Sequence, residues 1–311
     1  MYGLKQRNLT ASIMILGMLI MFTFITGCVD DEEEAVDEEN LLEEEVEDIS
    51  QKFGNELVGI DPGAGMMETA SDVLIPEYGL DDYELIESSE PAMIAALERA
   101  VGRDEWIAVL GWTPHWKWAE MDLKFLDDPK QIYGEAEDIR ALSRLGFEND
   151  FPEVKKLIDN FYINDEQLGS LMKLVEKKGD DMEAAVQWAE DNQDLINEWI
   201  PGDADGNGEE IKLLYNNWVC ARAKTNLVTH ILRDKMNYQV NKQMVEVGPL
   251  YQTLSDGEGD LMVHAWLPLT QANYWEEYGD RLVDHGPIYE GGKIGVVVPD
   301  YVDIDCITEM Q

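Results

Sequence analysis

The sequence predicts an α/β protein with a mostly parallel sheet. Short apolar runs of strand length recur along the chain, and helical stretches with N-cap signals lie between them. The length of 311 residues suggests two domains, or one large α/β unit. A hydrophobic fraction of 45% is enough to bury a core, so wholesale disorder is excluded.

Five apolar runs are expected to be strands because they are short and lack a helical period. They are Leu57–Ile60, Trp106–Leu110, Ile211–Tyr215, Leu261–Trp266 and Ile294–Val298. Strands that alternate with helices favour parallel pairing, since the helix returns the chain to the same end of the sheet.

Two helix starts carry capping signals. Ser88-Ser89 offers an N-cap before Pro91. Asn164 followed by Gln167 is typical of a capping box. The region from Glu135 to Trp199 shows several helical patterns and no convincing strand, which predicts a helical elaboration on one lobe.

The charge balance is strongly acidic. The chain has 65 Asp and Glu against 23 Lys and Arg, which gives a formal net charge of −42. Nucleic-acid binding is excluded because it needs clustered Lys and Arg, and docking on an anionic bilayer through a basic patch is excluded for the same reason. Such a surface keeps a protein soluble in concentrated salt and suggests a salt-loving source.

The first 27 residues are typical of a secretory signal peptide. Lys5 and Arg7 precede a largely apolar run, Ala11–Ile25, and ITGC ends at Cys28. ITGC resembles the lipobox of secreted lipoproteins, in which the Cys is lipidated and becomes the mature N-terminus. The alternative is an uncleaved transmembrane anchor. Both interpretations put the rest of the chain outside the cytoplasm, tethered to the membrane at one end.

An acidic segment follows Cys28. Thirteen of the nineteen residues from Asp30 to Asp48 are Asp or Glu. Because like charges repel and extend a chain, we expect a tether that holds the folded part away from the membrane.

The remaining cysteines, Cys220 and Cys306, could form a disulfide or stay as two buried thiols, and their spacing does not decide between these alternatives.

The segment from Asp203 resembles the first half of a calcium loop, but its twelfth position is Leu214 where such a loop has Glu. A polar linker is therefore favoured, and no metal site is predicted.

No sequence feature indicates an enzyme. P-loop, GxSxG and HExxH motifs are absent, and no carboxylate pair has a spacing that demands acid–base chemistry. We therefore predict no catalytic residue and no cofactor.

Tryptophans are the most informative residues. Trp112, Trp218 and Trp266 lie at the C-terminal ends of apolar runs, where ligands bind in open α/β sheets. Three indoles that converge there would bind a quaternary ammonium through cation–π attraction. The alternative for each is a cap on the hydrophobic core, as we expect for Trp188 and Trp199 in helical patterns.

A glycine-rich turn, Ile60–Met67, leads from a strand into an expected helix. Glycines let a backbone approach a ligand, and a helix N-terminus offers unpaired N–H groups to an anion. Together with a tryptophan box, this turn predicts a zwitterionic ligand with its ammonium on the indoles and its carboxylate on the N–H groups. The alternative is a simple tight turn.

Several segments resemble the substrate-binding proteins of glycine betaine/proline betaine ABC importers. They are GIDPGAGMM, GWTPHWKW, LKFLDDPKQIYG, HAWLP with YWEEY, and IGVVVPDYVDID. The resemblance covers most of the chain from about Leu57, in the circularly permuted order. It implies the two-lobed, type II-like periplasmic-binding-protein fold, with parallel or mixed sheets flanked by helices and the ligand in the cleft between the lobes.

This interpretation divides the chain into segments. They are a signal peptide (1–27), a lipidated Cys28 with an acidic tether (28–52), lobe 1 (53–118, with 300–311 returning to it) and lobe 2 (119–299), which includes the helical region 135–200 and a polar linker 201–209.

The resemblance also assigns site residues. The aromatic prism corresponds to Trp112, Trp218 and Trp266, and the carboxylate-binding amides correspond to Gly65 and Met66. Gln271 stands where relatives can carry a His that assists the carboxylate; a Gln amide can still donate, but it has no charge. We expect His115 to be structural, as a hydrogen-bonding residue at the hinge.

The resemblance implies a lipid-anchored protein that captures glycine betaine, an osmoprotective compatible solute, and delivers it to the permease and ATPase subunits of an ABC importer. The alternatives are binding of choline, carnitine or proline betaine, a ligand-binding domain that senses osmolytes, and an enzyme that acts on such zwitterions.

Overall fold

A computed structural model describes residues 48–202 and 204–311. The predicted signal peptide, Cys28 and the acidic segment before Asp48 lie outside the described residues, as does Asp203, the first residue of the calcium-like segment. In the part of the chain that the structure describes, no helix has the length and apolar character needed to cross a membrane.

The strands are β1 (Glu56–Val58), β2 (Glu84–Ile86), β3 (Ala108–Thr113), β4 (Leu123–Phe125), β5 (Glu137–Arg144), β6 (Glu210–Tyr215), β7 (Gln239–Met244), β8 (Leu261–Leu267) and β9 (Leu282–Pro299). The α-helices are α1 (Ile49–Lys52), α2 (Gly65–Thr69), α3 (Ile75–Tyr78), α4 (Glu90–Val101), α5 (Lys117–Glu120), α6 (Phe147–Asp150), α7 (Pro152–Asn160), α8 (Asp165–Lys178), α9 (Asp181–Asp191), α10 (Gln193–Trp199), α11 (Val219–His230), α12 (Val247–Ser255) and α13 (Ala272–Tyr278). Short π or 3-10 turns are η1 (Ala70–Leu74), η2 (Ile231–Lys235), η3 (Gly279–Arg281) and η4 (Ile307–Met310).

The strands are connected in the order β2-β1-β3-β9-β5-β8-β6-β7, and β4 also pairs with β9. Pairing is parallel between β2, β1 and β3 and between β8, β6 and β7. It is antiparallel where β9 pairs with β3, β4 and β5 and where β5 pairs with β8. The predicted α/β class is confirmed, but the sheet is mixed, because β9 runs against the strands on both sides of it.

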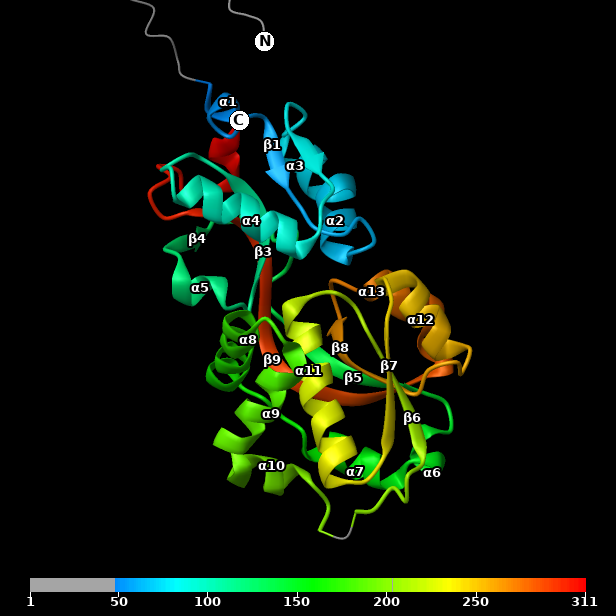
Figure 1. The fold of residues 1–311 in the computed structure, drawn as a ribbon. Helices are drawn as coiled ribbons and strands as arrows, with labels where there is room; N and C mark the ends of the chain where they lie inside the picture. The colour runs from blue at the N-terminus through cyan, green and yellow to red at the C-terminus, as the bar shows by residue number, and fades with distance from the viewer. Residues whose placement is uncertain (1–47, 203) are drawn as a thin grey trace, which may run out of the picture. The chain divides into compact units, whose positions relative to one another are not determined.

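The long strand β9 joins two groups of strands (Figure 1). Residues 293–299 pair with β3 and β4, and residues 282–292 pair with β5. We call β1–β4 with residues 293–299 lobe 1, and β5–β8 with residues 282–292 lobe 2. The predicted lobe 2, residues 119–299, is too long at both ends. Strand pairing assigns β4 and residues 293–299 of β9 to lobe 1, because β9 contributes one part of its length to each lobe.

All five predicted strands are present as β1, β3, β6, β8 and β9. The prediction that residues 135–199 hold no strand is wrong, because β5 (Glu137–Arg144) pairs with both β8 and β9. Its charged residues hide an apolar pattern, since Ile139, Ala141 and Leu142 are buried between them. The helices α6 to α10 occupy the rest of that region.

The end of the predicted tether is folded. Residues 48–52 were expected in the extended segment, but Asp48 caps helix α1 by accepting the Ser50 N–H at 3.1 Å. Ser50 and the following Phe53 are buried, so packing holds this turn in place.

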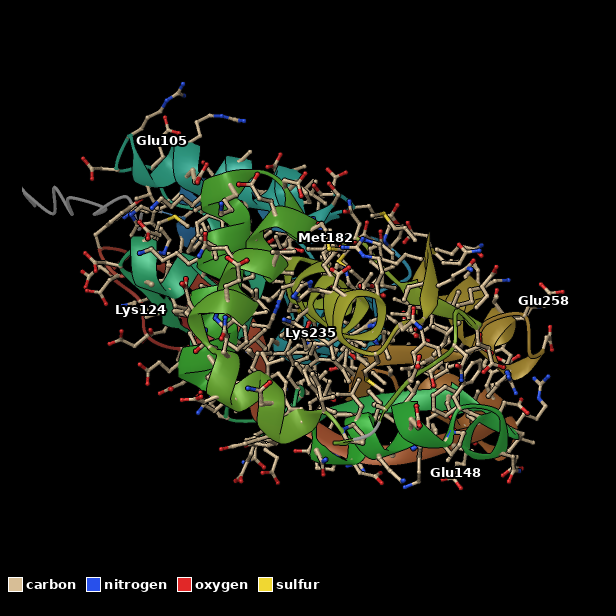
Figure 2. All side chains as sticks on the ribbon, turned by 60° about the horizontal axis from the view of Figure 1, so that its bottom comes forward. Glu105, Lys124, Glu148, Met182, Lys235 and Glu258 are labelled. Carbon is tan, nitrogen blue, oxygen red and sulfur yellow. The ribbon has the colours of Figure 1, made fainter. Side chains whose placement is uncertain are left out.

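Both predicted helix caps are confirmed. The Ser89 hydroxyl accepts the Ala92 N–H, and Asn164 and Gln167 exchange the two bonds of a capping box at 3.0 Å each. Carboxylates project outward around the periphery, as Glu105, Glu148 and Glu258 show in Figure 2.

One open alternative, a disulfide or two free thiols, is resolved. Cys220 and Cys306 are free thiols, the first buried and the second half-buried. In the polar linker, Asp205 uses one carboxylate oxygen to accept from Asn207 N–H and Asn237 Nδ2–H.

Trp188 and Trp199 are buried with their ring centroids 6.5 Å apart in a stacked arrangement, which confirms their place in the core.

Candidate functional site

A cavity lies between the two lobes. Its lining residues are Ile60, Ala64, Met66 and Trp112 of lobe 1, Trp218, Trp266 and Thr270 of lobe 2, and Ile294 of β9. None of these side chains carries a charge, although the chain has a net charge of −42. A cavity of this kind suits a small molecule without net charge.

The three indoles singled out by the sequence meet at this cavity. Trp112, Trp218 and Trp266 all line it, and each is at most 5% exposed. Because they come from β3, from the start of α11 and from β8, they form a wall only when the chain is folded. Their contact with a ligand stays a prediction.

Two of the indoles stand on strands. Trp112 pairs with Ile294 in the β3–β9 ladder, and Trp266 pairs with Ile139 in the β5–β8 ladder. The Trp266 N–H also donates to the Gln271 side-chain oxygen at 3.2 Å. A neighbouring strand therefore holds the backbone of each of these two tryptophans in place.

The third indole is held differently. Trp218 is the N-cap residue of α11, with extended backbone and no capping side-chain bond. Its Nε1–H donates to the Asp61 carboxylate at 3.0 Å, so a lobe 1 residue holds a lobe 2 ring. Asp61 lies inside the glycine-rich turn, but no sequence signal links it to Trp218.

The predicted carboxylate-binding segment adjoins the cavity. Gly65 and Met66 are the first two residues of α2, and their N–H groups precede any intrahelical acceptor. Met66 lines the cavity, and its carbonyl accepts from Tyr133 Oη at 2.9 Å. Gly65 is not a lining residue; a Cβ added there would lie 1.6 Å from the Thr270 carbonyl oxygen of lobe 2, so the close approach requires glycine.

Gln271 lies behind the wall rather than in it. The residue is buried and is not among those that line the cavity. Its Oε1 accepts from Tyr251 Oη at 2.8 Å and from the Trp266 N–H. The structure therefore places this predicted ligand-binding residue next to Trp266, where it supports the indole.

Glu137 shapes the loop after Trp266. Its carboxylate accepts the Leu269 and Thr270 N–H groups at 3.1 and 3.0 Å and bonds to the Thr270 hydroxyl. Burial raises the pKa of Glu137, which those donors oppose. This residue was missed because it belongs to β5, the strand that the sequence pattern does not reveal.

A buried lysine backs Trp112. Lys117 is fully buried, its Nζ lies 4.6 Å from the Trp112 ring centroid, and it donates to the Trp112 carbonyl at 3.3 Å. Burial lowers the pKa of Lys117 to about 7, and the nearby Glu90 opposes this shift. The Trp112 Nε1–H is buried and has no acceptor among the described residues.

His115 does not line the cavity. It is buried, its ring meets the Trp112 ring edge-on at 5.1 Å, and its Nε2 lies 2.8 Å from Glu90 Oε1. Burial holds its pKa well below the usual value, so the ring is neutral near pH 7. Within residues 48–202 and 204–311, no cluster of three or more His, Cys, Asp or Glu could hold a metal ion.

Comparisons with known proteins found similar sequences. Residues 32–191 and 209–311 match the family described as the substrate binding domain of ABC-type glycine betaine transport system. The glycine betaine/carnitine transport binding protein GbuC of Listeria monocytogenes is 38% identical over 267 residues, which are 85% of this chain and 88% of that protein.

Two solved structures are also similar in sequence. The glycine/betaine/L-proline-binding protein ProX of Borrelia burgdorferi is 36% identical, with a TM-score of 0.44 over 49% of this chain. Lactococcal OpuAC, closed on glycine betaine, is 30% identical, with a TM-score of 0.42 over 47% of this chain. The match spans 58% of each of those two chains.

Proposed function

Because the chain belongs to the family of substrate-binding domains of ABC-type glycine betaine transport systems, we propose that it captures glycine betaine itself between Trp112, Trp218 and Trp266. The observation that carries this proposal is the convergence of three indoles from two lobes on a cavity lined by uncharged side chains. Members of this family serve as extracytoplasmic components of importers, and transport proteins of this class are not enzymes.

The quaternary ammonium of the ligand would lie against the indoles. It has no N–H to donate, so an aromatic face attracts it without leaving a donor unpaired. A desolvated cation–π contact contributes about 2 kcal/mol, so three contacts supply most of the about 8 kcal/mol of a micromolar Kd.

The carboxylate would lie at the start of α2. The N–H groups of Gly65 and Met66 lie at the positive end of the helix dipole, and the helical segment continues through η1 and α3. The Trp112 Nε1–H, which has no acceptor among the described residues, is a further donor of the same wall. Gln271 would act through Trp266 rather than on the ligand, since its Oε1 holds the Trp266 N–H.

Closure of the lobes would complete the site. Trp112 belongs to lobe 1 and Trp218 and Trp266 to lobe 2, so only the closed arrangement brings all three rings to one ligand. A ligand that binds the closed form better than the open form shifts the equilibrium toward it.

A membrane anchor would keep the binding site close to its importer. We propose that Cys28 is lipidated and that the acidic segment after it tethers the domain to the outer face of the membrane, within reach of the permease of the importer. ITGC and the run of acidic residues in the sequence support this proposal.

Calorimetric titration with glycine betaine, proline betaine, carnitine and choline tests the ligand. We expect glycine betaine to bind with a micromolar or lower Kd and choline, which lacks a carboxylate, to bind at least tenfold more weakly. The affinity should persist in molar salt, because a dry cation–π contact is weakly screened. Choline binding equal to glycine betaine would contradict the role of the α2 N–H groups, and no binding of any of the four would contradict the proposal.

A further inference from the structure

Helix α11 begins at the cavity without a cap of its own. Its N-cap residue is Trp218, which makes no capping side-chain bond, and its first turn holds no acidic residue. The first N–H group of the helix, that of Val219, is nevertheless satisfied. It donates to Glu90 Oε2 at 2.6 Å, and Glu90 belongs to α4 of lobe 1, 129 residues earlier in the chain.

Lobe 1 holds this carboxylate in place before it meets α11. The His115 Nδ1 accepts the Lys117 N–H at 3.1 Å, so the ring proton is on Nε2 and is donated to Glu90 Oε1 at 2.8 Å. Glu90 is 3% exposed, so both oxygens are aimed by buried partners. One oxygen is bonded within lobe 1 and the other crosses to lobe 2.

The charges around Glu90 come from several elements. Burial raises the pKa of Glu90 to about 7; the Val219 N–H and the cations Arg222 and Lys117 oppose this shift, and Asp61 adds to it. Arg222 lies on α11 itself; its guanidinium pairs with Asp181 at 3.2 Å, and its charge favours the ionised form of Glu90.

We propose that Glu90 is a positioning residue that caps α11 from across the cleft and thereby couples lobe closure to the placement of Trp218. This inference rests on the proposed function, because it concerns how the glycine betaine site is assembled. When the lobes separate, the first turn of α11 loses its acceptor and Glu90 loses a donor. The cap therefore stabilises only the closed form, and Trp218, which directly precedes Val219, is fixed with it.

Two substitutions disturb the bond from opposite sides. Glu90→Gln keeps the size of the side chain, but it removes the charge and leaves one acceptor oxygen for two donors, His115 Nε2–H and Val219 N–H. Val219→Pro removes the N–H at the first position of the helix, where proline is favoured, and the extended backbone of Trp218 suits a residue before proline. Glu98→Gln is the matched control, because Glu98 is an exposed carboxylate on the same helix beside the same cleft.

Calorimetry with glycine betaine measures the binding affinity, which should fall when the closed form is less stable. We expect Glu90→Gln and Val219→Pro each to weaken binding about 10- to 100-fold, the range for a lost hydrogen bond to a charged group. The affinity of the double variant should be no lower than that of the single variant with the lower affinity. The affinity of Glu98→Gln should stay within about twofold of wild type. Wild-type affinity in both single variants, or additive losses in the double variant, would overturn the inference.

Amide hydrogen exchange separates this inference from the proposed function. With both proteins saturated with glycine betaine, peptides that contain the start of α11 should exchange faster in Glu90→Gln than in wild type, whereas the melting temperature of the ligand-free protein should barely change. If wild type does not bind glycine betaine, the proposed function fails, and exchange is compared with whichever of proline betaine, carnitine and choline does bind: equal rates in the two saturated proteins would then overturn the capping role of Glu90.

Discussion

Trp112 and Trp218 face the same cavity, but the fold holds them in opposite ways. Trp112 lies inside β3, pairs with Ile294 of β9 and has Lys117 packed over its ring. Trp218 lies outside any strand, and its polar partner, Asp61, belongs to the other lobe. The first wall is therefore built within one lobe, whereas the second needs contacts across the cleft. Trp266 is like Trp112, since it stands in the β5–β8 ladder.

The ligand affinity of the site should therefore depend on contacts across the cleft. We expect the two indoles on strands to keep their positions when the lobes open, because their ladder partners do not cross the cleft. We expect Trp218 to be fixed only on closure, because Asp61 reaches it from lobe 1. Substitutions that block closure should therefore cost more than substitutions that remove one wall.

The largest effect is expected for Gly65→Ala. Its Cβ would meet the Thr270 carbonyl oxygen at 1.6 Å, so the lobes could not approach as they do here. We expect glycine betaine binding to weaken at least about 100-fold, with each lobe still folded. Gly63→Ala is the control, because the nearest atom to its added Cβ is 4.0 Å away. Normal calorimetric affinity in Gly65→Ala would show that closure does not use this contact.

Alanine at each of the three tryptophans comes next. Loss of one cation–π face should weaken binding by about 1–3 kcal/mol, roughly 5- to 150-fold. Trp218→Ala should give the largest loss, since it also leaves Asp61 without its partner. Trp106→Ala, which removes a lobe 1 ring packed on Phe53 at 5.1 Å, should lower the melting temperature and leave Kd unchanged. Wild-type affinity in all three site variants, measured by calorimetry, would contradict binding of the ligand by the three indoles.

Lys117→Met tests the wall behind Trp112. The Lys117 pKa is lowered by burial from 10.5 to about 7, so between these pH values the folded chain binds fewer protons than the unfolded chain, and its contribution to stability rises with pH. The variant should therefore be more stable than wild type by about 1–4 kcal/mol at pH 7, and the gain should shrink toward pH 10. Urea unfolding across this range measures it; a gain that is independent of pH would contradict the assignment.

The smallest effect is expected for Asp61→Asn. The Asn oxygen can still accept the Trp218 Nε1–H, but the bond loses its charge and about 1 kcal/mol, roughly fivefold in Kd. Asp81→Asn, an exposed carboxylate of lobe 1, should leave Kd unchanged. A loss as large as that of Trp218→Ala would mean that Asp61 contacts the ligand itself.

Sequence patterns revealed the parts of the fold whose signals are local. β3, β6 and β8 were predicted because they are nearly continuous apolar runs, and the capping box at Asn164 because its two partners are three residues apart. β5 was missed because charged residues interrupt it, and β7 because it is a polar strand at the end of the strand order.

The site divides in the same way. The tryptophans and the glycine-rich turn could be predicted because they follow apolar runs directly. Asp61 and Glu90 could not, since their partners lie 157 and 129 residues away and only the folded chain brings them together. Gln271 is expected to touch the ligand because relatives can carry a ligand-assisting His at that position, and such a resemblance does not show which way a buried amide points.

A crystal structure of the protein with glycine betaine tests the central claim most directly. We expect the ligand nitrogen to lie within about 6 Å of the ring centroids of Trp112, Trp218 and Trp266. The ligand carboxylate should accept hydrogen bonds from the N–H groups of Gly65 and Met66. A ligand nitrogen held by carboxylates elsewhere in the cleft, with the three indoles empty, would contradict it.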